Sequence, residues 1–162
     1  MHAIYGALLD DLTAACHQHY GGRLVSLGVF GSVGRGAPHA DSDIDVLLIA
    51  EDLPPGRVRR VDDFGAVEVA VAPRLAEARA SGLYPTVSAV LKTPTEVEQG
   101  SLLFLDMLDD LRLLHDRDGF MARTLAALKA RLERLGAKRI WRGNAWFWDL
   151  KPDYKPGEVF EI

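Results

Sequence analysis

The sequence predicts an α/β fold, with a small mixed sheet of four or five strands flanked by helices. Two short apolar runs, Leu24–Phe30 and Val46–Ala50, are bounded by glycine and polar clusters, as buried strands are. Apolar residues recur at helical spacing in residues 3–19 and 120–135, which predicts a helix at each position. Both periodicities in one short chain indicate helices packed on a sheet.

The remaining elements follow from local patterns. Prolines and a glycine predict a turn over residues 51–56, and Tyr84–Lys92 is typical of a strand. Thr93, Pro94 and Glu96 form the pattern of a capped helix start. A further helix over residues 102–111 and a short strand over residues 112–116 follow.

Residues 57–81 are ambiguous. Their two ends favour a helix, but residues 66–72 alternate loosely and are rich in valine, which favours a strand. Both interpretations stay open, and they decide whether Glu68 lies on a strand.

Composition limits the classes of partner and the cellular location that we expect. The chain has 162 residues and a net charge of −4, so bulk positive charge for gripping nucleic acid is missing. Its single cysteine, Cys16, has no partner for an internal disulfide. Apolar runs stay well short of the roughly 18 residues that span a bilayer, so we expect a cytoplasmic protein without a membrane segment.

Asp43 and Asp45 introduce the second apolar run and are the strongest candidates for a site. Alternate residues of a strand share a face, with Cα atoms about 6.6 Å apart, so both carboxylates can lean onto one cation. Magnesium binds such a pair better when a nucleotide adds phosphate oxygens. The turn at Gly31 and Ser32 can offer backbone N–H groups to those phosphates. We therefore expect phosphate donors beside metal-binding carboxylates.

The spacing of these residues resembles that of the minimal nucleotidyltransferases, within the DNA polymerase β superfamily. Their pattern is Gly-Ser, ten residues, then Asp-x-Asp, and here ten residues separate Ser32 from Asp43. The resemblance implies that Asp43 and Asp45 are catalytic and hold Mg²⁺, while Gly31 and Ser32 seat the triphosphate. Arg35 follows closely enough to help hold it, or is a solvated loop arginine.

Other phosphate and metal motifs fail on the same residues. No Lys-Ser/Thr follows the glycines, and their spacing does not fit a dinucleotide fingerprint. A calcium loop starting at Asp41 would need glycine and glutamate where Val46 and Asp52 stand. A purely structural pair of carboxylates at a buried strand is costly.

The superfamily usually has a third carboxylate on a neighbouring strand, which takes the proton from the attacking hydroxyl. Glu68 would fill this role if residues 66–72 form a strand. The strand predicted at Tyr84–Lys92 is the natural place for that acid, and it contains none. The resemblance then leaves the proton to water or to an acceptor that ionises by itself.

The resemblance also implies a reaction and a partner. Minimal nucleotidyltransferases transfer AMP from ATP to a hydroxyl, and many are antitoxins paired with a HEPN-type ribonuclease toxin. Some of them silence that toxin by adenylylating a tyrosine. A small-molecule transferase of the aminoglycoside-modifying kind is the enzymatic alternative. A catalytically weak module that binds a nucleotide or partner is the other, although two adjacent acids argue against it.

Residues 1–136 are predicted to form the nucleotidyltransferase domain, and residues 137–162 a C-terminal tail. All three tryptophans, Trp141, Trp146 and Trp148, lie in this tail among basic residues. The tail is expected to fold over its own domain. A protein interface, including a homodimer, is the second interpretation, and nucleic acid is the least favoured.

Overall fold

The structure, a computed structural model, describes residues 3–143 and 145–162. The chain divides into two compact units, residues 1–121 and residues 122–162. In chain order the first unit contains α1 (Ala3–Tyr20), β1 (Leu24–Phe30), α2 (Gly31–Gly34), β2 (Ile44–Ala50), α3 (Arg57–Ala80), β3 (Val87–Lys92), α4 (Pro94–Glu98), α5 (Leu103–Asp110) and β4 (Arg112–Asp116), with short 3₁₀ turns at Gly21–Arg23 and Arg117–Gly119.

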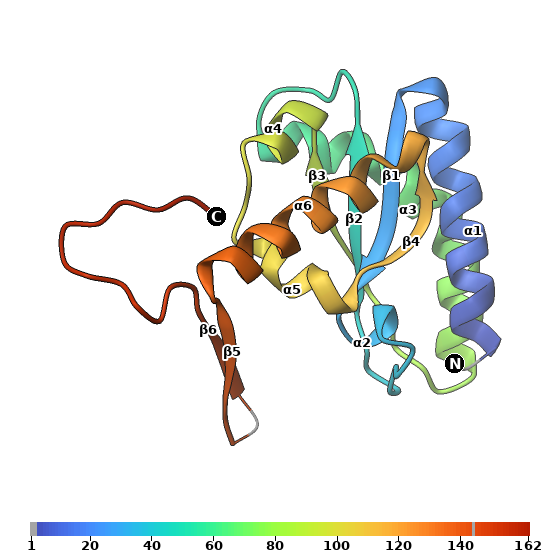
Figure 1. The fold of residues 1–162 in the computed structure, drawn as a ribbon. Helices are drawn as coiled ribbons and strands as arrows, with labels where there is room; N and C mark the ends of the chain where they lie inside the picture. Colours follow the sequence, from blue (N-terminus) through green and yellow to red (C-terminus); the bar gives the residue numbers. More distant parts are fainter. Residues whose placement is uncertain (1–2, 144) are drawn as a thin grey trace. The chain divides into compact units, whose positions relative to one another are not determined.

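The four strands of this unit form one mixed sheet in the order β3-β2-β1-β4 (Figure 1). Strand β1 is antiparallel to both of its neighbours, whereas β2 and β3 are parallel and joined by α3. The predicted α/β fold with a small mixed sheet and flanking helices is therefore confirmed.

Strand β2 is buried on both faces. Val46, Leu48 and Ala50 belong to the core that includes α1 and α3 residues, and Leu47 and Ile49 on the opposite face are buried too. Helices α1 and α3 lie on one side of the sheet, and α4 and α5 lie on the other (Figure 1). Burial on both faces explains why β2 is continuously apolar from Val46 to Ala50 rather than alternating.

Residues 57–80 form one helix, so the strand interpretation of residues 66–72 is wrong, and with it the placement of Glu68 as a strand-borne general base. The buried residues Phe64, Val67, Val71 and Ala78 follow helical spacing. Val69, which contributed to the apparent alternation, is 75% exposed. Packing against α1 selects the helix, and Glu68 is an exposed residue on it.

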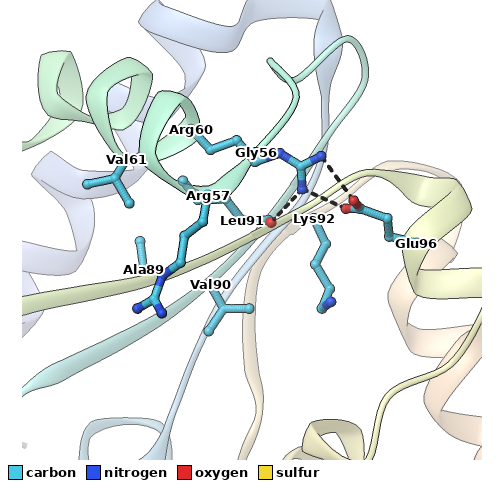
Figure 2. Close-up of a pocket in the computed structure, with 9 residues that line it drawn as sticks. All are labelled: Gly56, Arg57, Arg60, Val61, Ala89, Val90, Leu91, Lys92 and Glu96. Carbon is cyan, nitrogen blue, oxygen red and sulfur yellow. Dashed lines mark hydrogen bonds and ion pairs between the residues drawn. The ribbon is translucent and has the colours of Figure 1, made fainter.

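Helix α4 begins with the predicted capping box. The Thr93 hydroxyl accepts from the Glu96 N–H at 3.3 Å, and the Glu96 carboxylate accepts from the Thr93 N–H at 2.9 Å. The same carboxylate accepts two bonds from the Arg60 guanidinium, which also donates to the Leu91 carbonyl (Figure 2). The Arg60 bonds, chiefly, hold the pKa of Glu96 at about 2.

The second unit contains α6 (Phe120–Leu135) from residue 122 onward and an antiparallel hairpin of β5 (Lys138–Arg142) and β6 (Ala145–Asp149). The guanidinium of Arg139 lies 5.1 Å from the ring of Trp141, which is 60% exposed. The Trp146 side chain lies outside what the structure describes. None of the described helices combines the length and apolar composition needed to cross a membrane.

Replacing Glu96 by glutamine should change how stability depends on pH. The folded-state pKa of Glu96 is about 2, below its ordinary value of 4.5, so its stabilisation is complete above pH 4.5 and is lost as the pH falls towards 2. Between these values the free energy of unfolding should fall less steeply in Glu96→Gln than in the unmodified protein. The pair is partly exposed, so we expect a loss on the order of 1 kcal/mol at neutral pH. Urea unfolding at several pH values measures both, and parallel curves would contradict the assignment.

Candidate active site

The turn at Gly31 packs directly against Asp45. Strand pairing sets Phe30, the last residue of β1, opposite Asp45 of β2, so the chain turns beside that carboxylate. Gly31 has φ +65°, and a Cβ there would lie 2.6 Å from Asp45 Oδ2. Glycine suits this position because it adopts a positive φ without strain and leaves the Asp45 carboxylate where it is. The structure thus brings together the glycine turn and the acid that the sequence places in one site.

Asp43 and Asp45 influence each other electrostatically. Burial, and then the negative charge of Asp43, raise the pKa of Asp45 above its ordinary value. Asp43 is exposed and accepts a hydrogen bond from the Thr86 hydroxyl. Two carboxylates that repel each other in a half-buried place suit a divalent cation.

The donor set fits magnesium and a nucleotide better than a metal held by protein alone. Within residues 3–143 and 145–162, no three His, Cys, Asp or Glu side chains group as a metal cluster. Mg²⁺ is commonly bound by one or two carboxylates with substrate phosphates and water completing its shell. Asp43 and Asp45 can supply the protein's share.

Ser32 is tied to the loop that leads to the acids. Its hydroxyl donates to Ser42 Oγ at 3.0 Å, and Ser42 Oγ also accepts from the His39 N–H at 2.8 Å. The Tyr5 hydroxyl on α1 donates to the His39 carbonyl at 2.9 Å. Ser42 is only 2% exposed, and sequence reasoning missed it because its neighbours are polar.

Arg35 forms an ion pair with Asp110 at the end of α5. The Asp110 side chain is 13% exposed and that of Arg35 is 52% exposed. Asp110, which the sequence analysis does not single out, is thus a missed partner of Arg35. Gly34 makes this packing possible, because a Cβ there would lie 2.7 Å from the Val29 carbonyl oxygen and would also overlap the Asp110 carbonyl.

Strand β3 lies beside the acids but adds no third carboxylate. Its residues pair in parallel register, with Ile44 beside Val87 and Asp45 beside Ser88. Continuing this register backward places Thr86 beside Asp43, in agreement with their hydrogen bond. A parallel pairing of the two predicted strands would have pointed to Thr86, but the sequence does not state the register.

Comparisons with known proteins agree with this geometry. Residues 10–82 match the model of a family described as "Nucleotidyltransferase domain". A relative from Methanocaldococcus jannaschii, named "Putative protein adenylyltransferase MJ1305", is 28% identical over 141 residues, covering 86% of this chain and 90% of its own. The matched residues, somewhat less than half of the chain, contain Gly31, Ser32, Asp43 and Asp45, so the candidate site lies within the part that is similar to a nucleotidyltransferase domain.

Solved structures were also compared. One is described as a toxin-antitoxin with AMP-PNP; it has a TM-score of 0.45 and 16% identity, and the match covers 79% of this chain and 92% of that chain. Another is described as the toxin-antitoxin MntA-HepT; it has a TM-score of 0.44 and 12% identity, and the match covers 81% and 92% respectively.

Alanine at position 31 should destabilise the protein more than alanine at position 36. Both glycines have positive φ, but a Cβ at Gly36 would meet nothing within 4 Å. Gly36→Ala should therefore cost the backbone strain alone, about 1–2 kcal/mol. Gly31→Ala adds the overlap with Asp45 Oδ2, which the carboxylate can relieve by leaving its rotamer, and should cost roughly 0.5–1.5 kcal/mol more. Urea unfolding compares the two, and equal losses would show that the turn does not press on the carboxylate.

Asp43→Asn should lower the pKa of Asp45. The change removes the negative charge that opposes ionisation of Asp45, while the burial that also raises this pKa stays. Titration of the Asp45 carboxyl by carbon NMR, without divalent cations, measures the shift. Asp41→Asn is the control with the same charge change, because Asp41 does not contribute to this pKa. An unchanged Asp45 pKa in Asp43→Asn would mean that the two acids point apart.

Proposed function

We propose that this protein transfers AMP from ATP to a hydroxyl group of a protein acceptor. One observation carries the proposal: the turn at Gly31 lies against Asp45, whose charge is coupled to that of Asp43. This geometry supports a phosphate cradle beside a pair of metal-binding carboxylates.

Each residue of the site has a proposed role. Asp43 and Asp45 hold Mg²⁺, which when bound offsets charge on the phosphates and activates the acceptor oxygen. Gly31 and Ser32 seat the triphosphate through their backbone N–H groups. Arg35 has five N–H donors, so its pairing with Asp110 leaves donors on an exposed guanidinium for a phosphate.

The chemistry favours an acceptor that loses its proton easily. The acceptor oxygen attacks the α-phosphorus, the bond to the β-phosphate oxygen breaks, and pyrophosphate leaves. Ser88 beside Asp45 is no base, and β3 contains no acid, so the proton passes to water. A tyrosine, with an ordinary pKa of about 10, ionises far more readily than serine or threonine and is the proposed acceptor.

The proposed partner is a protein that carries such a tyrosine. The name of the archaeal relative, a protein adenylyltransferase, supports a protein acceptor. That this partner is a HEPN-type toxin, with the present chain as its antitoxin, rests on the resemblance of residues 31–45 to the minimal nucleotidyltransferases. A cytoplasmic location and a homodimer formed through residues 137–162 stay predictions.

Asp43→Asn and Asp45→Asn should each reduce transfer at least about a hundredfold, because each removes a carboxylate that balances charge at the reacting phosphate. The measurement is transfer of label from α-³²P-ATP, with Mg²⁺, to a candidate HEPN-type protein and to its tyrosine-to-phenylalanine variants. Asp41→Asn is a matched control outside the proposed metal pair. EDTA should stop transfer by the unmodified protein.

Three outcomes would overturn parts of the proposal. Inhibition of the partner without nucleotide and without label transfer would indicate a binding module. Transfer to aminoglycosides but not to protein would indicate a small-molecule transferase. Full activity in both asparagine variants would place the site elsewhere in the chain.

A further inference from the structure

A cavity of about 440 Å³ lies along β3 at the edge of the sheet. Its lining includes Ala89–Lys92 of β3 and Arg57 and Val61 from the start of α3 (Figure 2). None of these residues takes part in the site described above, so the cavity needs its own explanation.

The main chain of β3 is open on the side away from β2. Among the described residues no strand pairs with β3 on that side. The Thr86 carbonyl points to β2, where it accepts a hydrogen bond from the Ile44 N–H at 2.8 Å. Main-chain groups alternate in direction along a strand, so the N–H and C=O groups of Val87, Ala89 and Leu91 point away from β2. The Arg60 guanidinium already donates a hydrogen bond to the Leu91 carbonyl at 3.2 Å. The outward groups of Val87 and Ala89 can pair with an added strand.

The cavity carries positive charge that the described residues do not balance. Arg60 is neutralised by Glu96. Within residues 3–143 and 145–162, neither Arg57 nor Lys92 forms an ion pair, although the charge of Lys92 helps to lower the pKa of Glu96. The lining therefore holds three cations and one carboxylate, which leaves a net positive charge. In a chain with net charge −4, two such cations on one cavity favour an acidic ligand.

The register joins this edge to the acids. Ser88 lies directly beside Asp45, and a strand added to β3 would lie about 4.8 Å beyond Ser88. A residue paired with Ser88 on that strand would share the Asp45 face of the sheet. Val90 and Lys92 lie two and four residues after Ser88 on β3. The cavity therefore extends from Ser88 towards the C-terminal end of β3 only.

We propose that the β3 edge and its cavity dock the acceptor as an extended, acidic polypeptide segment, which adds a strand to the sheet and presents its hydroxyl beside Ser88. This rests on the proposed adenylyl transfer. The segment carries Asp or Glu two to four residues from the hydroxyl, on one side only, where Arg57 and Lys92 meet them. The edge thus selects the acceptor while Gly31, Asp43 and Asp45 serve the nucleotide.

The test uses a library of soluble eleven-residue peptides with a central tyrosine and a fluorescent label. Binding to the full chain is measured by anisotropy without nucleotide, so it does not depend on catalysis. We expect acids on one side of the tyrosine to strengthen binding at least tenfold over Asn and Gln. Arg57→Ala with Lys92→Ala should abolish this preference. The control, Arg59→Ala with Arg79→Ala, removes the same charge from exposed residues outside the cavity and should change it less than twofold.

Strand addition has a separate signature. Two versions of the best peptide, N-methylated at alternate residues in opposite phases, should differ, because only one phase removes the N–H groups that face β3. Equal binding of the two versions, or an acid preference on both sides of the tyrosine, would overturn the proposed geometry. If no peptide of the library binds, the proposed docking site is wrong.

Transfer assays on the same peptides separate this inference from the proposed function. Acid-dependent binding without label transfer from α-³²P-ATP would leave the docking edge standing and refute the transferase. Transfer without acid preference would refute the docking edge alone. A raised KM for ATP in the Arg57 and Lys92 variant, with peptide binding unchanged, would show that these cations serve the triphosphate.

Discussion

The contact between the Gly31 backbone and the Asp45 carboxylate is the constraint on which the site depends. The pairing of Phe30 with Asp45 ends β1 beside the acid, and a residue with a Cβ would strike Asp45 Oδ2. The chain must therefore reverse at a glycine with positive φ. The remaining parts of the site follow from that reversal, because it starts α2 and sends the chain through the loop anchored at Ser42 before it returns as β2.

This arrangement is unfavourable for the isolated protein. Asp45 loses part of its hydration, and the charge of Asp43 opposes its ionisation further. The described residues place a hydroxyl, that of Thr86, on Asp43 rather than a cation. A single asparagine in place of Asp43 or Asp45 would remove the repulsion between the two carboxylates. Its presence in the fold favours a ligand that relieves it. The repulsion between the two acids and the close approach of Gly31 to Asp45 are independent observations, and both indicate a ligand site at this turn.

The sequence predicts what local chemistry decides. The capping box at Thr93, the apolar runs of β1 and β2 and the spacing from Ser32 to Asp43 are all local, and the first two recur in the structure. Misjudged residues depend on distant partners. Residues 66–72 alternate like a strand until packing against α1 selects Phe64, Val67 and Val71 as the buried face. Asp110 and Thr86 meet Arg35 and Asp43 across separations of 75 and 43 residues, and no single-sequence pattern encodes such a meeting.

Strand β3 lacks an acid and has an open edge, and both properties bear on how an acceptor hydroxyl would be selected. A strand that carried its own base would supply the proton acceptor for any hydroxyl. Without one, the proposed transfer would rely on the acidity of the acceptor and on how accurately it is held, because positioning alone can supply a large part of a rate enhancement. A small domain has few surfaces on which to hold another protein, but the outer edge of β3, which no described strand covers, offers main-chain groups in a fixed register with Asp45. Under the proposed docking, the strand that selects the acceptor is the same strand that carries no acid to take its proton.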